Sequence, residues 1–212
     1  MLMRKEEKTA AKLLSRKGLI KAEAEKQLGK EVTETVWKEA QDRLAGILER
    51  YADLPSGARF HTYSYIFPGA AIYLALKEHT DAEKAYSIIR TASLQKASEA
   101  GEKLARIIGK PGMRPVFFGF FSFLTKHLFG KNNGFQNVFY PKKKGEYRMD
   151  ILACPYHRYM NELGCGELTE IFCDNDEYTY GKLPGVAFIR TGTLGKGCDR
   201  CDFCLRYTEK QQ

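Results

Sequence analysis

The sequence has 212 residues and no long apolar run. Its most apolar segment, residues 115–124, covers ten positions and contains Gly119 and Ser122. That is about half of the roughly 20 residues that a membrane-spanning helix needs. Residues 1–14 contain no apolar stretch of the kind found in signal peptides. These absences predict a cytoplasmic protein without a membrane partner.

Concentrated positive charge is also scarce, although the formal net charge is +8. Lys142-Lys143-Lys144 is the only compact basic run, and Pro141 and Gly145 flank it as in a solvated turn. Neither the cysteine–histidine spacing of a zinc finger nor an RNA-recognition motif is present. We therefore do not expect nucleic acid as a partner.

Cysteine is missing from residues 1–153, and all six cysteines of the chain lie after them. In a reducing compartment such cysteines are thiols or metal ligands rather than a disulfide framework. Internal repeats and low-complexity linkers are absent as well. The length fits one domain, residues 1–212, in which residues 1–53 form a helical arm.

Apolar periodicity changes along the chain from a helical to a strand pattern. Helices are predicted over 3–27 (with a break at Gly18), 31–53, 81–108 and 115–129, the last as a buried helix. A β-hairpin over 135–140 and 146–153, helices over 155–160 and 167–180, and strands over 186–193 and 201–207 follow. The fold class is α+β, with N-terminal helices packed with a small C-terminal antiparallel sheet that carries one or two helices.

The helix predicted over 167–180 presents a chemically reactive face. Steps of three and four residues place a thiol, a carboxylate and a phenol side by side on that face: Thr169, Cys173, Asp176 and Tyr180. A nearby carboxylate raises the pKa of a cysteine, so a cation is needed to activate Cys173. The candidates are His157, Arg158 and Arg190. A buried core cysteine without a chemical role is the alternative interpretation.

The last three cysteines have the spacing C-x2-C-x2-C: Cys198, Cys201 and Cys204. This spacing is similar to that of zinc or iron–sulfur sites, with Cys154, Cys165 or Cys173 as a fourth ligand. However, Cys201 and Cys204 point to opposite faces if 201–207 is a strand. We therefore expect no metal and no other cofactor. Because a helix over a small sheet brings these segments together, we expect Cys173 to lie near Cys201.

Several of these motifs together resemble the L-2-amino-thiazoline-4-carboxylic acid hydrolase family. They are Glu162-Leu163-Gly164, Glu167-Leu168, Phe172-Cys173 with Asp176, Arg190-Thr191, Thr193-Leu194, and Gly197 followed by Cys201-Asp202-Phe203. Upstream, Phe67-Pro68 to Tyr73-x-Ala75-Leu76 and residues 82–88 are similar to the helical signature of the family. The resemblance covers about residues 60–208. The C-terminal half also resembles 4-vinyl reductase-like small-molecule-binding domains. Cys198 and Cys204 depart from the usual pattern.

The resemblance implies a hydrolase that opens a cyclic C–N bond in a small anionic molecule, giving a carbamoyl-cysteine. Cys173 is the expected nucleophile, and His157 or Asp176 is the expected proton carrier. The expected substrate-binding residues are Arg190, which would hold a carboxylate, and Thr193, Tyr180 and Cys201. A non-catalytic binding or sensor domain and a cysteine-rich metal protein are the alternatives. The expected partner is a small-molecule substrate, and a homodimer is kept open.

Overall fold

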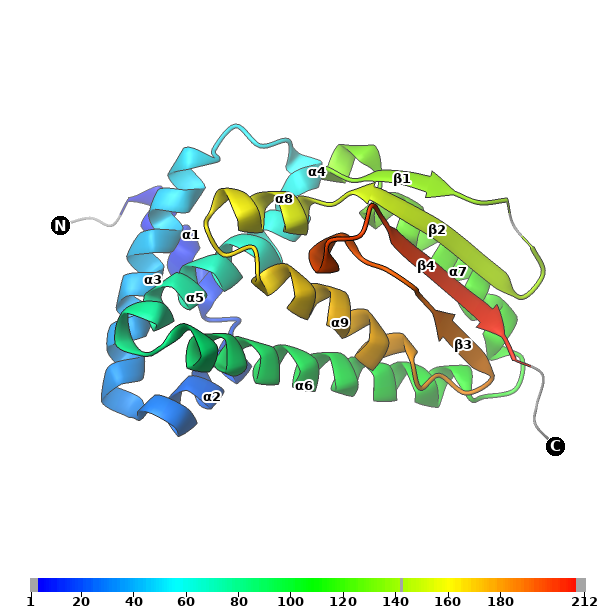
Figure 1. Cartoon of the computed structure of the whole chain (residues 1–212), viewed down its shortest axis with the longest axis horizontal. Helices are drawn as coiled ribbons and strands as arrows, with labels where there is room; N and C mark the ends of the chain where they lie inside the picture. The colour runs from blue at the N-terminus through cyan, green and yellow to red at the C-terminus, as the bar shows by residue number, and fades with distance from the viewer. Residues whose placement is uncertain (1–3, 142, 209–212) are drawn as a thin grey trace. The chain divides into compact units, whose positions relative to one another are not determined.

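A computed structural model describes residues 4–141 and 143–208. Within them, the chain forms two compact units (Figure 1). The first comprises residues 4–93 and 159–168, and the second comprises residues 94–141, 143–158 and 169–208. Three helices contribute residues to both units: α6 (Ala82–Ile108), α8 (Pro155–Glu162) and α9 (Leu168–Tyr180).

The first unit is helical. Its elements are α1 (Lys5–Leu14), α2 (Gly18–Leu28), α3 (Lys30–Arg50), α4 (Ser56–His61), the π-helical turn η1 (Thr62–Ile66) and α5 (Phe67–His79). The long helix α3 packs against both α1 and α5. Nine residues of α5 are buried, among them Phe67 and Tyr73, so this helix forms the centre of the unit. Cys165 also lies in this unit, with its thiol 3.5 Å from Met160 Sδ.

The second unit is built on a four-stranded antiparallel sheet with strand order β1-β2-β4-β3 (Figure 1). The strands are β1 (Gln136–Phe139), β2 (Glu146–Ala153), β3 (Val186–Ile189) and β4 (Cys201–Tyr207). Helix α7 (Met113–Leu128) lies along one face, and the short helical turns η2 (Lys131–Asn133) and η3 (Leu194–Lys196) precede β1 and β4. The α+β prediction is therefore confirmed.

Strand alternation decides which side chains enter the core of the second unit. On β4, Cys201, Phe203 and Leu205 point to the face that packs on α7, where they meet Phe117 and Phe121. Cys204 lies between them in the strand and therefore points to the opposite face. The register pairs Ile151 of β2 with Cys201, which places Cys201 at the first pair of the β2–β4 ladder.

The structure corrects three predictions: the limits of one helix, the limits of one strand, and the burial of another helix. The helix expected over 3–27 is two helices that are separated at residues 15–17, and Gly18 begins the second. The strand expected over 186–193 ends at Ile189, because the following residues turn to form a loop. Helix α7 is present, but it is not buried, since Val116, Phe120 and Phe123 are exposed. None of the described helices is both long and apolar enough to cross a membrane. The single-domain interpretation stays a prediction.

Candidate functional site

Helix α9 brings the predicted reactive face to the sheet of the second unit. Thr169 is buried, Cys173 is half-buried, and Asp176 follows one turn later. The hydroxyl oxygen of Thr169 is buried without a hydrogen-bond partner in the structure. Buried polar groups are normally hydrogen-bonded, so this unsatisfied hydroxyl one turn before Cys173 sets the segment apart from ordinary helix core.

The loop between β3 and β4 covers this face of α9. Thr193 caps the start of η3, and its hydroxyl oxygen accepts a hydrogen bond of 3.2 Å from the backbone N–H of Lys196. Gly197 ends the turn with φ at 81°, a conformation that favours glycine. The Lys196 ammonium lies 3.0 Å from the Asp174 carboxylate of α9. The loop is therefore fixed at its start, at its end and on the helix beneath it.

Gly195 allows the loop to approach the helix closely. A Cβ atom at this position would lie 3.0 Å from Cys173 Sγ and 3.0 Å from Thr169 Cγ2. The backbone N–H of Gly195 donates a hydrogen bond to the Cys173 sulfur. A side chain here would push the loop away and remove that donor.

Four neighbours stabilise negative charge on the sulfur of Cys173. The Cys201 thiol donates a hydrogen bond to it, and burial opposes ionisation; the Thr193 hydroxyl, the Arg190 charge and the Gly195 N–H then favour it. Together they lower the pKa of Cys173 to about 6. Conversely, its role as donor raises the pKa of the Cys201 thiol, and burial raises it further. The expected proximity of Cys173 and Cys201 is confirmed.

Arg190 joins the end of β3 to α9. Its NH1 group donates to the Cys173 backbone oxygen at 2.9 Å and to Asp176 Oδ2 at 3.1 Å. Its NH2 group donates to Glu177 Oε1 at 3.0 Å. The Arg190 side chain is only 4% exposed. The guanidinium is therefore held by protein acceptors, next to a surface cavity of about 290 Å³ that Glu177, Gly181, Lys182 and Phe188 also line.

The surroundings of Asp176 raise the pKa of its carboxyl, which favours the protonated form. Loss of surrounding water and the charge of Cys173 together raise its pKa to about 7, against the opposing charge of Arg190. Because 41% of the side chain stays accessible, water limits this rise. Cys173 and Asp176 thus disfavour each other's negative charge, and the two groups titrate as a pair.

Asp202 is the main anchor of the loop, a role that the sequence pattern did not predict. Its Oδ1 accepts hydrogen bonds of 2.8 Å from the backbone N–H groups of Thr191 and Gly192, and its Oδ2 accepts one of 2.6 Å from the Thr191 hydroxyl. Burial alone would raise the pKa of Asp202, but these hydrogen bonds outweigh it and hold the pKa below its usual value. The Thr-Gly dipeptide eleven and ten residues upstream was the available signal, since such turns offer free N–H groups.

Cys154 is a third thiol beside the site. The sequence indicates it only as a candidate metal ligand and does not predict this position. Its sulfur accepts hydrogen bonds from the backbone N–H groups of Tyr156 and His157 at the start of α8. Burial, together with the charges of Cys173 and Asp176, nevertheless raises its pKa to about 12. Cys154 is therefore a neutral thiol within electrostatic range of Cys173. Its position before a Pro-x-His helix start is the sequence signal that indicates such capping.

Of the other predicted site residues, some lie beside Cys173 and others do not. Thr193 and Cys201 are buried beside Cys173. Tyr180 points into the aromatic core, with its ring 5.5 Å from Phe121 and 5.6 Å from Phe203, and burial raises its pKa. His157 has an exposed side chain on α8, and it contributes to the cysteine cluster through its backbone N–H.

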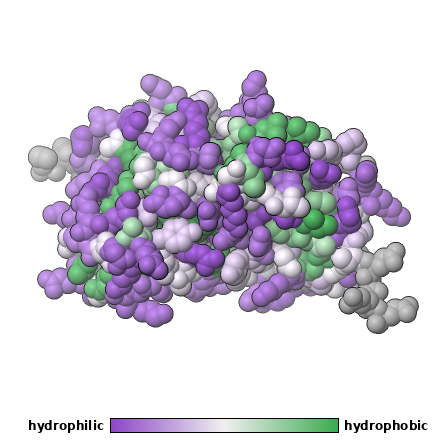
Figure 2. All heavy atoms as spheres, viewed as in Figure 1, coloured by the Kyte–Doolittle hydropathy of each residue, from purple (hydrophilic) through white to green (hydrophobic). Residues whose placement is uncertain are grey.

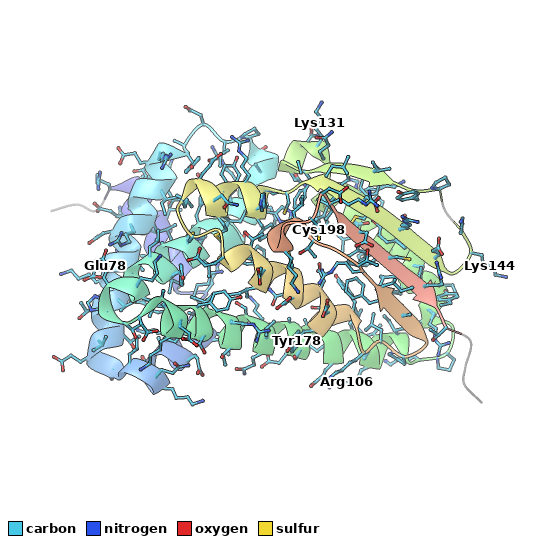
Figure 3. All side chains as sticks on the ribbon, viewed as in Figure 1. Glu78, Arg106, Lys131, Lys144, Tyr178 and Cys198 are labelled. Atoms are coloured by element: carbon cyan, nitrogen blue, oxygen red, sulfur yellow. The ribbon has the colours of Figure 1, made fainter. Side chains whose placement is uncertain are left out.

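The remaining cysteines of the C-x2-C-x2-C spacing are separated by the fold. Cys201 points to the α7 side of the sheet, whereas Cys204 points to the other side. Cys198 is exposed in the turn after η3 (Figure 3). Its side chain lies close to Gly192. Among residues 4–141 and 143–208, no three His, Cys, Asp or Glu side chains are grouped so that they could hold a metal ion.

Comparison with known proteins supports the family resemblance. The family model described as L-2-amino-thiazoline-4-carboxylic acid hydrolase matches residues 59–205, which include Cys173, Arg190 and Cys201. Searches of curated proteins and of solved structures gave no match. The matched segment covers more than half of the sequence and contains the whole loop that covers Cys173. The chain therefore belongs to the L-2-amino-thiazoline-4-carboxylic acid hydrolase family.

Proposed function

We propose that this protein hydrolyses a small cyclic amidine of the thiazoline-carboxylate class, with Cys173 as the nucleophile. The observation that carries the proposal is the set of donors on its sulfur: the Cys201 thiol, the Thr193 hydroxyl and the Gly195 N–H. A thiolate stabilised in this way is present near neutral pH and is a strong nucleophile. Cys173 is half-buried rather than fully enclosed in the core.

The proposed reaction begins at the amidine carbon of the ring. The Cys173 sulfur forms a bond to that carbon, and the bond from the carbon to the ring sulfur breaks. A proton is delivered to the departing sulfur, and the opened chain remains attached to Cys173 as an isothiourea. Water then adds to the same carbon and releases the Cys173 thiolate with a carbamoyl-cysteine product. Since that product keeps both nitrogens on the carbon, the attacked group is the cyclic amidine and the cleaved ring bond is C–S, not the C–N bond that the resemblance led us to expect.

Asp176 is the proposed proton carrier. Its pKa is raised while that of Cys173 is lowered, so the carboxyl keeps its proton to a higher pH than the thiol does. This is the combination that a nucleophile and a general acid require in one site. His157 remains a second candidate, and its exposed position on α8 would require it to act at the surface of the site.

Arg190 is proposed to act mainly by positioning. Its contacts to Asp176 and to the Cys173 backbone oxygen fix the distance between nucleophile and acid, and its charge lowers the pKa of Cys173. The neighbouring cavity also contains the exposed Lys182 side chain, which is a cation available for a substrate carboxylate. Thr193 and Cys201 would orient the thiolate, and Tyr180 would form part of the apolar wall.

The test is turnover of a panel of cyclic amidines and lactams, including L-2-amino-thiazoline-4-carboxylate, by the purified full-length protein. Products are identified by mass spectrometry, and the intact protein is examined for the mass of the isothiourea adduct. We expect Cys173→Ser to lower kcat by about 10³-fold or more, because a hydroxyl is a far weaker nucleophile. Cys204→Ser is the matched control, since its thiol points to the other side of the sheet.

Two outcomes would contradict the proposal. If Cys173→Ser keeps the full rate while Asp176→Asn is inactive, the nucleophile is a water that the carboxylate activates. If no member of the panel is turned over but one of them raises the melting temperature, the protein is a small-molecule-binding domain.

A further inference from the structure

Helix α7 has a second apolar face that nothing in the described part of the chain covers. Val116, Phe120 and Phe123 are 58%, 60% and 61% exposed. They follow one another at spacings of four and three residues and therefore lie on one face of the helix. Gly119 lies beside them, and a Cβ atom there would meet nothing within 4 Å. Val116, Phe120 and Phe123 thus form a continuous, open apolar stripe on α7.

The opposite face of α7 packs against the sheet and forms part of the core of the second unit. Phe117, Phe121 and Thr125 are buried, and Phe121 lies 5.0 Å from Tyr147 and 5.8 Å from Phe203 of the sheet, ring to ring. A helix that is apolar on all sides is normally buried. Three large apolar side chains left exposed together on such a helix are typical of an interaction surface.

The sequence around this helix is free of acidic residues. Residues 103–145 contain no Asp or Glu, but they contain nine Lys and Arg. The formal charge of this segment is therefore +9, against +8 for the whole chain of 212 residues. The stripe thus lies, in the sequence, within the most basic acid-free segment of the protein.

Several of these basic side chains are exposed at the borders of the stripe. Lys110 precedes α7, Lys126 lies in its last turn, and Lys131 follows it, and all three are exposed. Figure 3 shows Lys131, Lys144 and Arg106 directed outward at three different edges of the second unit. Helix α7 lies behind the sheet in Figure 1, so the stripe is on the side away from the viewer. On the viewed side, Figure 2 shows hydrophobic patches around the strands that are interrupted by hydrophilic side chains.

We propose that α7 docks the protein on the surface of an anionic phospholipid bilayer, with Val116, Phe120 and Phe123 inserted at the headgroup boundary and the flanking lysines on the lipid phosphates. An interfacial helix of this kind needs an apolar face for the acyl chains and cations beside it for acidic headgroups, and α7 provides both. This proposal departs from the expectation that the protein has no membrane partner.

Two other occupants fit the surface less well. A second copy of the chain in a twofold dimer would bring the same basic segment against itself, which is repulsive. Nucleic acid would bind the lysines through its phosphates, but it would leave the aliphatic and aromatic stripe without a comparable apolar environment. The bilayer surface alone matches the apolar stripe and the positive charge together.

The test is sedimentation of the full-length protein with vesicles. One set is pure phosphatidylcholine, and the other contains about one third phosphatidylserine, which provides the anionic surface potential. We expect binding to the anionic vesicles, weak or no binding to the neutral vesicles, and release as salt is raised to about 0.5 M because the lysine–phosphate attraction is screened.

Variants separate the two contributions. Phe120→Ser with Phe123→Ser should weaken binding to anionic vesicles by about tenfold or more, since two exposed rings no longer enter the lipid. Val138→Ser, which replaces another exposed apolar side chain of the same unit, is the matched control and should leave binding unchanged. Lys126→Glu with Lys131→Glu should also weaken binding to anionic vesicles, and the loss should be larger at low salt than at high salt. Lys30→Glu on α3 is the control and should have little effect on binding.

Some results would overturn the proposal. Equal or absent binding of the native protein to both vesicle sets would do so. A concentration-dependent dimer that Phe120→Ser with Phe123→Ser dissociates, in a protein that does not bind vesicles, would assign the stripe to a second copy. Because these side chains are exposed, the variants should keep the native circular dichroism spectrum; if they do not, the lysine pair and the salt series decide.

Discussion

The thiol of Cys201 donates a hydrogen bond to the sulfur of Cys173. The two residues are 28 positions apart and come from β4 and α9, and the backbone N–H of Leu194 donates in turn to Cys201 Sγ at 3.2 Å. A neutral thiol thus supports an ionised one. Arg190, Thr193 and Gly195 all act on Cys173, which is why the charge belongs on this sulfur rather than on that of Cys201.

Replacing Cys201 by alanine should therefore raise the pKa of Cys173. Loss of a hydrogen bond to a charged group costs about 1.5–3 kcal/mol, which corresponds to a rise of about one to two pH units. The rate at which iodoacetamide alkylates Cys173, followed by peptide mass spectrometry across a pH series, measures this pKa. Cys204→Ala is the control, because its thiol points away from the site. An unchanged titration in Cys201→Ala would show that the thiol pair does not set the reactivity.

Much of this site could be predicted from residue spacing. The alternation of C-D-F-C-L-R-Y predicted β4 with its observed limits and placed Cys201 and Cys204 on opposite faces. The helical spacing likewise placed Thr169, Cys173 and Asp176 on one side of α9. Both conclusions rest on local geometry, which short segments of sequence contain in full.

The features that were missed depend on segments that are distant in sequence or on the backbone. The donors on Cys173 include the N–H of Gly195, and a backbone group has no residue type by which it can be recognised. Cys154 reaches the site because α8 begins there, and Asp202 becomes an anchor only when the loop folds back on β4. The apolar composition of α7 predicted burial, because sequence does not say how many faces of a helix the rest of the chain covers.

The pH dependence of kcat/KM should be bell-shaped, with its maximum between about 6 and 7. Activity rises as Cys173 loses its proton, because the thiolate is the nucleophile, and it falls as Asp176 loses its proton, because the acid is then spent. Asp176→Asn should remove the falling limb and lower kcat, since an amide cannot deliver the proton. A wild-type profile that stays level above pH 7 would indicate that Asp176 does not act as the acid.

Gly195→Ala should impair catalysis more than folding. The new methyl group would lie 3.0 Å from Cys173 Sγ, so the loop must move outward, and its N–H would no longer reach the sulfur. We expect a loss of about 100-fold in kcat/KM from this displacement, with a destabilisation of about 1–3 kcal/mol. Gly46→Ala on α3 is the control, because a Cβ atom there meets nothing within 4 Å. Enzyme assays and urea unfolding of both variants distinguish a local from a general effect.

Asp202→Ala should destabilise the folded protein in a pH-dependent manner. Three donors from Thr191 and Gly192 lose their common acceptor, and the expected cost is about 1–3 kcal/mol at neutral pH. Because hydrogen bonds hold the folded-state pKa of Asp202 below its usual value, its contribution is complete above the unfolded-state pKa of about 3.9. That contribution is lost as the pH falls through the folded-state value, so the stabilities of wild type and variant should converge in acid. Asp202→Asn keeps one acceptor oxygen and should fall between the two. Urea unfolding at neutral and acidic pH measures these differences, and a gap between wild type and Asp202→Ala that stays constant into acid would show that the charge of Asp202 does not hold the loop.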